Sequence, residues 1–359
     1  MKKYFLTVAA ALTVALVAAG GALAKGHPAE AGPGFTHSLI PTFAPDPRAW
    51  LQLLDLPPNP QPQSPEPAPA SASQEQVPNP EPQAPNPLRA TTLSIYEHDA
   101  QPWTLSGQGC SAARRQENGI VVLDFGKPAY ERGGYGTVLF SGRFAKNHKI
   151  TAAMLSYAYG YTHCLPEGST AYIELARGTS NYHPAVPSAY TAGVRWARET
   201  NELGWLLREH GLAGHVGAAA ADDAEPAWDP SFHTTRDFFH GFRLAVHGHT
   251  LYDYGSLDGG VGAVWTARQA WYVAGGLPHT KALPEIYNSA MAREWAELAR
   301  IARGRYHRDV RFAGVMTQGT SSCSCGLRPT EAHRVLERAL DTAGVEKALL
   351  PQGGTNIVG

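Results

Sequence analysis

The sequence carries little charge and almost no net charge. Only 17% of its 359 residues are charged, and 30 basic residues nearly balance 31 acidic ones, which leaves a net charge of -1. Proteins that bind nucleic acids need clustered lysine and arginine, because these side chains displace counterions from the phosphates. The composition therefore argues against a nucleic-acid partner, and it gives no reason to expect an anionic membrane surface as one.

Long apolar runs are absent after the first 24 residues. Spanning a bilayer takes roughly 18 apolar residues, and no later stretch of the sequence approaches that length. Residues 1–24 contain two lysines, an apolar run over residues 4–17 and small residues that end in Ala22-Leu23-Ala24. This is the pattern of a secretory signal peptide. We therefore expect an exported protein, secreted or held at the cell surface, without a transmembrane segment.

Residues 25–90 are poor in large apolar side chains. From about residue 41 to residue 87 the segment consists mainly of Pro, Gln, Ala, Ser, Asn and Glu. Such a composition buries too little apolar surface to offset the entropy of ordering it, and its prolines favour extended polyproline II. The sequence thus predicts a Pro-rich stalk over residues 25–90 and a folded domain over residues 91–350.

Cysteine is scarce, with four in the chain. In an exported protein an even number of cysteines indicates disulfides. A zinc site is the alternative, but a single residue separates Cys323 from Cys325, whereas structural zinc sites usually have roughly two to four residues between paired cysteines. We expect disulfides among Cys110, Cys164, Cys323 and Cys325. The preferred pair is Cys110–Cys164, because each precedes an apparent strand and both would then lie at the same end of a parallel sheet.

Several catalytic signatures are also missing. The sequence has no G-x-S-x-G nucleophile motif, no H-E-x-x-H zinc motif and no G-x-G-x-x-G turn after a strand. The tightest histidine pair, His247-Gly248-His249, precedes a predicted strand and would lie at the opposite end of that strand from the acids described below. We therefore expect neither a bound metal nor an organic cofactor.

Strand-like and helix-like patterns alternate through the folded part. The predicted helices cover residues 188–210 and follow Asp229-Pro230, Ser289 and Pro329. Parallel strands need long crossovers, so this alternation is typical of helices that cover a parallel sheet. We predict an α/β fold of the (β/α) TIM-barrel type with seven recognisable strand–helix units rather than eight; an open doubly wound sheet is the alternative. The predicted strands are residues 119–126, 170–178, 215–226, 249–256, 269–276, 281–288 and 311–320.

Carboxylates and tyrosines concentrate where the predicted strands end. In a barrel these ends meet at one mouth, and barrel enzymes place their chemistry there. Adjacent residues on a strand face opposite sides, so Asp223 rather than Asp222 is expected at the mouth together with Glu225. The candidate catalytic residues are Asp124, Asp223, Glu225 and Glu285, and the candidate substrate-binding residues are Trp228, Tyr252, Asp253, Tyr272, Tyr287 and Gln318.

Paired carboxylates have a specific chemical use. Cleavage of a glycosidic bond takes one protonated acid beside the leaving oxygen and one ionised carboxylate that attacks the sugar or activates water. Crowding of acids raises the pKa of one of them and keeps it protonated, and aromatic faces suit sugar rings. The residues therefore predict a glycoside hydrolase with Glu225 as the proton donor and Asp124 or Asp223 as the assisting carboxylate.

The order of these motifs resembles that of a known family. "LDFG" in an early strand, D-x-E in a middle strand, "AWYVAGG" and "EIYN" at aromatic strand ends and a glutamine in the last strand resemble the lysozyme-like glycoside hydrolases that cut bacterial wall glycan. The sequence looks closer still to the related secreted glycoside hydrolase-like barrel domains of unknown function. The resemblance spans roughly residues 118–343. It implies that Asp124, Asp223 and Glu225 lie in the active site and that the partner is a polysaccharide such as peptidoglycan.

Two departures from the family pattern favour an alternative function. The first-strand motif of the family continues D-x-S, whereas this chain has Asp124-Phe125-Gly126. One early strand–helix unit is also not recognisable between residues 178 and 214. The alternative is a catalytically inactive barrel that binds cell-wall glycan, and a plain partner-binding exported domain is a third hypothesis.

Overall fold

The computed structural model describes residues 91–182, 186–318, 326–345, 350–351 and 353–359. The expectations for the signal peptide, for the Pro-rich stalk and for Cys323 and Cys325 lie outside these residues. The described residues cover most of the predicted folded part, residues 91–350, and extend past its predicted end to residue 359.

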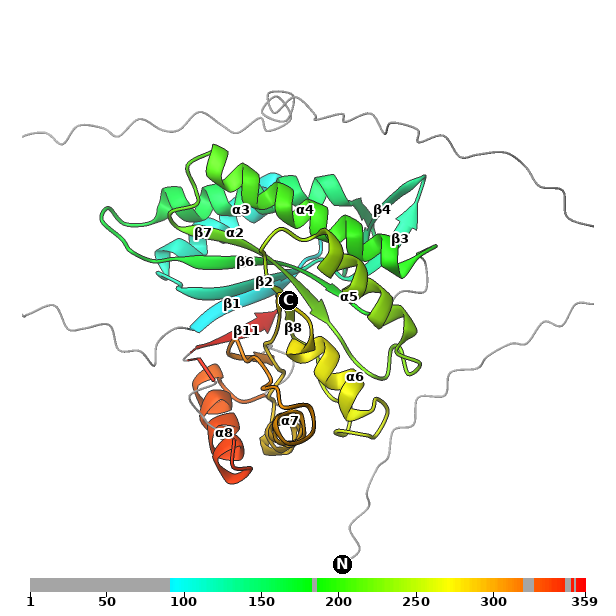
Figure 1. Ribbon diagram of the computed structural model, residues 1–359. Coiled ribbons are helices and arrows are strands. Elements are labelled where there is room, and N and C mark those ends of the chain that lie inside the picture. The colour runs from blue at the N-terminus through cyan, green and yellow to red at the C-terminus, as the bar shows by residue number, and fades with distance from the viewer. Residues whose placement is uncertain (1–90, 183–185, 319–325, 346–349, 352) are drawn as a thin grey trace, which may run out of the picture. The chain divides into compact units, whose positions relative to one another are not determined.

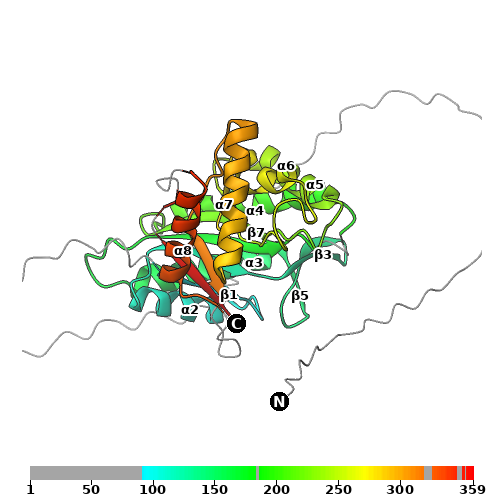
Figure 2. The same cartoon turned by 90° about the horizontal axis from the view of Figure 1, so that it is seen from below.

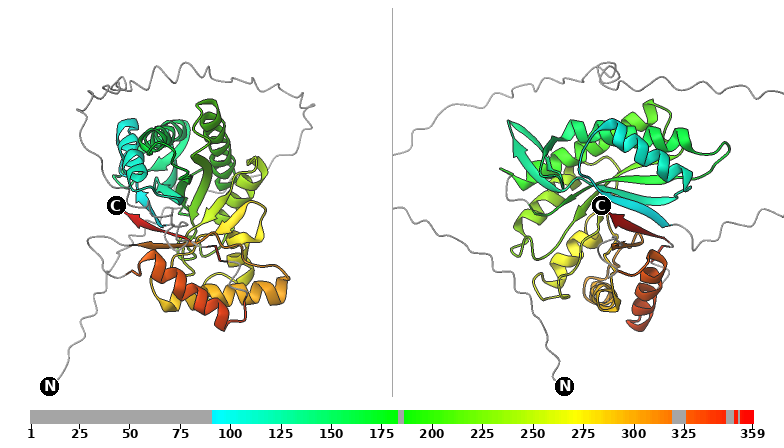
Figure 3. Two further views of the ribbon diagram at one scale, coloured as in Figure 1. Left: turned by 90° about the vertical axis from the view of Figure 1, so that its left-hand side faces the viewer. Right: turned by 180° about the vertical axis from the view of Figure 1, so that it is seen from behind.

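A parallel sheet of eight strands forms the centre of the fold (Figure 1). The sheet is curled into a half-barrel, and helices cover its outer side (Figure 3). The α/β class predicted from the sequence is therefore confirmed. In order of neighbours, the strands are β10 (Val315–Gln318), β11 (Gly354–Val358), β1 (Thr91–Tyr96), β2 (Gly119–Asp124), β6 (Ile173–Ser180), β7 (Val216–Asp223), β8 (Leu251–Asp253) and β9 (Thr280–Ala282).

The two edges of this sheet, β9 and β10, are linked by isolated contacts rather than by a continuous strand ladder. Parallel bridges join Ala282 to Phe312 and Glu285 to Met316. The backbone N–H of Ala313 also donates to the carbonyl of Ala282 at 2.7 Å. These contacts bring the end of β9, and with it Glu285, next to β10.

A helix follows each strand of the sheet except β11 among the described residues. α6 and α7 continue into short π-helical turns, η2 (Tyr272–Gly276) and η3 (Ala302–Tyr306). None of the helices in the described ranges is both long and apolar enough to cross a membrane. The helices are α2 (Pro102–Arg114), α3 (Asn147–Cys164), α4 (Ala189–Glu209), α5 (His233–Ala245), α6 (Ala267–Trp271), α7 (Ser289–Ile301) and α8 (Pro329–Thr342).

The inner face of the curled sheet has its own small apolar core. Ala219 and Ala221 of β7 lie in this core beside Tyr252 and Tyr254, the tyrosines of β8 and of the residue after it. The alanines leave room for the two rings, and strand alternation then points Asp223 to the same inner side. Ala219 and Ala221 are thus small because two tyrosine rings fill the inner side of the half-barrel, whereas Ala218 and Ala220 pack on the helix side.

Two of the eight strands escaped the sequence analysis, and one predicted strand is wrong. β1 and β11 pair with each other in the centre of the sheet. The sheet therefore has eight strands, whereas seven strand–helix units were expected. Residues 269–276 form the end of α6 and the turn η2 instead of a strand. Thr266 caps α6 in a capping box with Gln269, which starts a helix there. Among the described residues between 178 and 214, the chain completes β6 and then forms α4, so it holds a helix and no additional strand.

Two helix starts differ slightly from the predictions. α5 begins at His233 after Phe232, and Asp229 caps it from a distance by accepting a hydrogen bond from the Thr235 N–H at 2.8 Å. α7 begins at Ser289 itself, and Asn288 is its N-cap. α4 and α8 lie where helices were predicted.

A small antiparallel sheet interrupts the alternation between β2 and α3. It consists of β3 (Lys127–Glu131), β4 (Gly134–Val138) and β5 (Phe144–Lys146), and in Figure 2 β3 and β5 lie on the side away from α8. Gly126 joins it to β2 with φ +79°, and a Cβ at this position would lie 2.4 Å from the carbonyl oxygen of Val138. Only glycine allows this close approach. The insertion is therefore held against the carboxyl end of β2.

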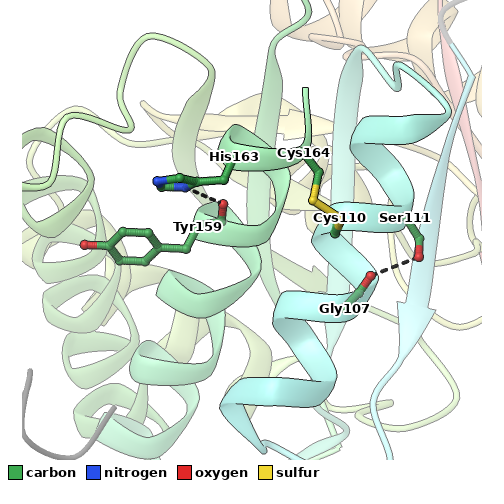
Figure 4. Close-up of a disulfide and its surroundings, with 6 residues drawn as sticks. All are labelled: Gly107, Cys110, Ser111, Tyr159, His163 and Cys164. Atoms are coloured by element: carbon green, nitrogen blue, oxygen red, sulfur yellow. Dashed lines mark hydrogen bonds between the residues drawn. A yellow bond between two sulfur atoms is a disulfide. The ribbon is translucent and has the colours of Figure 1, made fainter. Parts of the chain in front are cut away.

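The predicted disulfide between Cys110 and Cys164 is present (Figure 4). It joins α2 to the last residue of α3, with the Cα atoms 5.0 Å apart. Cys110 lies within a helix rather than just before a strand, so the packing of α2 against α3 brings the two cysteines together, and the expected position of Cys110 before a strand is wrong. The two helices approach closely at glycines: a Cβ at Gly109 would lie 2.1 Å from the carbonyl oxygen of Tyr157.

Candidate active site

A cavity of about 820 Å³ lies at the carboxyl ends of the parallel strands. Asp124 is the last residue of β2, Asp223 is the last of β7 and Gln318 is the last of β10. All three line the cavity, as do four further predicted residues. The predicted site residues that the structure brings together here are Asp124, Asp223, Glu225, Trp228, Glu285, Tyr287 and Gln318.

Three predicted substrate-binding residues do not line this cavity. Tyr252 lies deeper in the half-barrel, where its hydroxyl donates to Glu174 Oε2 at 2.6 Å. Asp253 alternates with Tyr252 and therefore points toward the helix side, where it is buried. Tyr272 lies in η2, because its segment is helical, and its ring packs edge-on against Phe232 at a centroid distance of 5.6 Å.

Asp124 is held at the end of β2 by the turn that follows it. The Gly126 N–H donates to its Oδ1 at 2.8 Å, and the nearby Tyr254 hydroxyl, which donates to the Thr179 carbonyl at 3.1 Å, also lowers the pKa of the carboxyl. Burial outweighs both effects and raises the pKa of Asp124 from 3.8 to about 6. Asp124 is thus ionised above about pH 6 although it is almost fully buried.

Asp223 lies among the other acids of the cavity. It is 7% exposed, and its Oδ1 has no hydrogen-bond partner within the described residues. Burial raises the pKa of Asp223 well above its ordinary value, and the charges of Glu285, Glu225 and Asp124 raise it further. Burial and the neighbouring acids therefore both favour the protonated form of the Asp223 carboxyl.

Glu225 lies two residues beyond Asp223, in a loop that is fixed through its backbone. Asn181 Nδ2 donates to the carbonyl of Glu225 at 2.9 Å, and the Glu225 N–H donates to Asn181 Oδ1 at 3.1 Å. The Ser256 hydroxyl donates to Glu225 Oε1 at 3.2 Å. Burial and the charge of Asp258 raise the pKa of Glu225. Glu225 is less buried than Asp223, so its carboxyl is accessible from the cavity.

Glu285 reaches the cavity from the segment after β9. The hydroxyl of Tyr287 donates to its Oε1, which lowers the pKa, but burial is the larger effect. The charge of Glu225 raises the pKa further, and the result is a pKa of about 8. Glu285 is therefore protonated at neutral pH, when Asp124 is ionised.

Two further acids lie behind the cavity, on the helix side of the sheet. Asp222 and Asp253 are register partners on β7 and β8, and both are buried. Neither carboxylate oxygen of Asp222 has a hydrogen-bond partner among the described residues. Burial raises the pKa of Asp253 to about 8, and burial followed by the charge of Asp253 raises the pKa of Asp222.

A scan against models of known protein families finds no match for this chain, and a search of curated proteins finds none either. The family resemblance seen in the sequence thus has structural support only at the level of the fold, a curled parallel α/β sheet that is compatible with a barrel. The chemistry has to be inferred from the cavity itself.

The sequence analysis missed several residues of the cavity. Tyr96 ends β1, a strand that was not predicted, and its ring packs against Phe140 with the centroids 4.8 Å apart. Lys127 and Phe140 come from the inserted antiparallel sheet and its loop, for which no sequence pattern was recognised. The alternation in "TTLSIY" was a usable signal for Tyr96. The missed residues are Tyr96, Gly126, Lys127, Val138, Leu139, Phe140, Gly142, Ser180 and Tyr182.

The side chains that line the cavity could transfer protons and could place aromatic rings against a ligand. The cavity contains carboxyls in both protonation states near neutral pH, because the pKa of Asp124 is about 6 and that of Glu285 about 8. Within the described ranges, no three His, Cys, Asp or Glu side chains are grouped so that they could hold a metal ion. Trp228 is 40% exposed and Phe140 46%, so their rings are available at the cavity.

Proposed function

We propose that this protein is an exported glycoside hydrolase that cleaves a cell-wall or extracellular polysaccharide by carboxylate acid/base catalysis. The observation that carries the proposal is the convergence of four carboxylates, from three separate strand ends, in one cavity with exposed aromatic rings. Pairs of carboxyls with different protonation states are what glycosidic cleavage requires. Pockets of this size with aromatic walls suit small sugar units.

In the proposed mechanism Glu225 donates a proton to the leaving oxygen of the glycosidic bond. Burial raises its pKa, which favours the protonated carboxyl, and Asn181 fixes its backbone toward the cavity. Asp124, which ionises at about pH 6, either attacks the anomeric carbon or removes a proton from the attacking water. Asp223 and Glu285 remain protonated and keep the negative charge of the site low.

The geometry of the parallel sheet is compatible with a (β/α) barrel of the TIM type, which is a more specific fold than a curled α/β sheet. The parallel strands follow chain order around the sheet, and bridges join the two edges next to Glu285. In such barrels the active site lies at the carboxyl ends of the strands, where this cavity lies. The disulfide between α2 and α3 agrees with an exported, extracytoplasmic protein.

A catalytically inactive glycan-binding barrel is the second candidate, and one observation favours it. The family motif D-x-S would require a serine at position 126, but there a Cβ would lie 2.4 Å from the carbonyl oxygen of Val138. The backbone around Asp124 thus excludes the family's serine. If this serine is essential for turnover, the cavity retains glycan binding only.

Incubation of the full chain with insoluble peptidoglycan separates these functions. Retention in the pellet together with released reducing ends supports the hydrolase. Retention without release supports the inactive glycan-binding barrel. If the chain is not retained and releases no reducing ends, with peptidoglycan and with other wall polysaccharides, both functions are contradicted. An exported partner-binding domain is then the hypothesis that is left.

A further inference from the structure

Lys127 is the one basic side chain among the described residues that line the cavity. It is the first residue of β3, and the β3–β4 ladder pairs its backbone with Val138. The hydroxyl of Thr179 donates to the carbonyl of Gly126 at 2.8 Å, which fixes the turn just before Lys127. The backbone of Lys127 is therefore held rigidly at the edge of the carboxylate cluster.

The ammonium group of Lys127 lies over an aromatic ring instead of pairing with an acid. Its Nζ is 5.3 Å from the centroid of the Tyr182 ring, within the range of a cation–π interaction. No ion pair joins Lys127 to a carboxylate in the part of the chain that the structure describes. A lysine that served to neutralise the nearby acids would contact one of them, so this charge is available to a ligand.

We propose that Lys127 and Tyr182 form a subsite for the anionic substituent of an acidic sugar. This inference rests on the proposed function, because the subsite belongs to the same cavity, and it specifies the substrate as a polysaccharide with carboxylate or sulfate groups. The Tyr182 ring is 41% exposed and offers a flat face to the sugar, while the ammonium donates charge-assisted hydrogen bonds to the anionic group.

The acids of the cavity do not prevent an anionic substrate from binding. With a pKa of about 8, Glu285 is protonated at neutral pH, and the raised pKa of Asp223 removes a second negative charge. Lys127 lies at the start of the inserted sheet, whereas Glu285 lies beyond β9 on a different segment. The sugar carrying the charge is therefore held next to the reacting carboxyls by an element outside the parallel sheet.

Calorimetric titration of the full chain with three probes tests the inference. The probes are trimers of galacturonate, of sulfated galactose and of neutral galactose, which differ only in the charged group. We expect the wild type to bind at least one acidic trimer more tightly than the neutral one. Lys127→Met is expected to lower the ratio of acidic to neutral affinity about tenfold or more, and Lys127→Arg to retain most of it.

Lys281→Met is the matched control, since Lys281 is exposed on β9 and does not line the cavity. We expect it to leave both affinities unchanged. Tighter binding of the galacturonate or of the sulfated trimer identifies which anionic group is bound, and either supports the subsite. Equal loss of acidic and neutral binding in Lys127→Met, or no preference in the wild type, overturns the subsite but not the hydrolase. If reducing ends are released from no polysaccharide and no trimer binds, the proposed function itself fails.

Discussion

Asn181 bonds both polar backbone groups of Glu225. Its Nδ2 donates to the Glu225 carbonyl at 2.9 Å and its Oδ1 accepts from the Glu225 N–H at 3.1 Å, while the same Nδ2 also donates to the Thr235 hydroxyl. A buried side chain at the end of β6 thus fixes the loop that carries the proposed proton donor. The orientation of Glu225 depends on this bridge between two neighbouring strand ends.

Replacement of Asn181 by alanine is expected to disorient Glu225. We expect a loss of about 1–3 kcal/mol in the free energy of unfolding, because buried backbone groups lose their partners. We also expect a fall of about a hundredfold in kcat, since small misplacements of a catalytic group are costly. Chemical denaturation and reducing-end assays measure the two effects.

Asn201→Ala is the control for this prediction. Asn201 makes the same kind of bridge, to the Ala245 carbonyl and the His247 N–H at 2.8 Å each. None of these three residues lines the cavity. It should lose a comparable amount of stability and keep its activity. Equal activity losses in the two variants would show that Asn181 acts only through stability.

Tyr254→Phe is expected to move the acid limb of the pH–activity profile to higher pH. The Tyr254 hydroxyl lowers the pKa of Asp124, which is about 6, so its removal raises that pKa and delays ionisation. The profile of kcat/KM against pH measures the shift. Tyr252→Phe removes a bond to Glu174 instead, and its acid limb should stay in place. An unshifted limb in Tyr254→Phe argues against Asp124 as the ionised partner.

The central strands β2 and β7 could be predicted from the sequence because they contain continuous apolar runs, whereas β6 mixes apolar residues with Glu174 and Arg177. β2, β6 and β7 are buried on both faces, which gives the pattern expected for a covered parallel sheet. "TTLSIY" and "GTNIV" are as central, but polar side chains such as Ser94 and Thr355 hydrogen-bond to each other there, which hid both strands. Residues 269–276 were predicted as a strand but are helical, since an apolar run of this length fits a buried helix equally well.

Asp253→Asn is expected to stabilise the protein increasingly as the pH rises. Burial raises the pKa of Asp253 from 3.8 to about 8, so the folded state must keep a proton that the unfolded chain releases above about pH 4. The stability contributed by the wild-type residue is full below about pH 4 and is lost as the pH rises to about 8. Asparagine has no such loss, and the difference in unfolding free energy between variant and wild type should grow across this range.

Denaturant unfolding at several pH values checks this difference. Asp237→Asn serves as the control, because Asp237 is 47% exposed on α5. Its difference from the wild type should stay small across the same range. A constant difference for Asp253→Asn would mean that Asp253 is ionised in the folded protein.

Trp228→Ala is expected to weaken glycan binding. The ring is 40% exposed at the cavity, and loss of the apolar area that it would bury against a sugar costs about 1–2 kcal/mol, or about tenfold in affinity. Trp205 on α4 is similarly exposed at 39% but does not line the cavity. Trp205→Ala should bind as the wild type does. Calorimetry with an oligosaccharide that the wild type binds tests both, and similar losses would contradict the prediction.

The acidic half of the cavity could be predicted and the other half could not, for a physical reason. In a parallel sheet, strand ends share one edge, so Asp124, Asp223 and Glu285 could be placed together without coordinates. Lys127 and Phe140 reach the cavity on an antiparallel insertion, whose position depends on the close contact at Gly126. Tertiary contacts of this kind leave no periodic signal in the sequence.

The most direct test of the central claim is the rate at which reducing ends are released from a susceptible glycan by the Glu225→Gln variant. Glu209→Gln, on the exposed end of α4, is the matched control. If Glu225 is the proton donor, Glu225→Gln remains folded and loses hydrolysis while Glu209→Gln keeps it. Unchanged release by a folded Glu225→Gln variant would contradict the account.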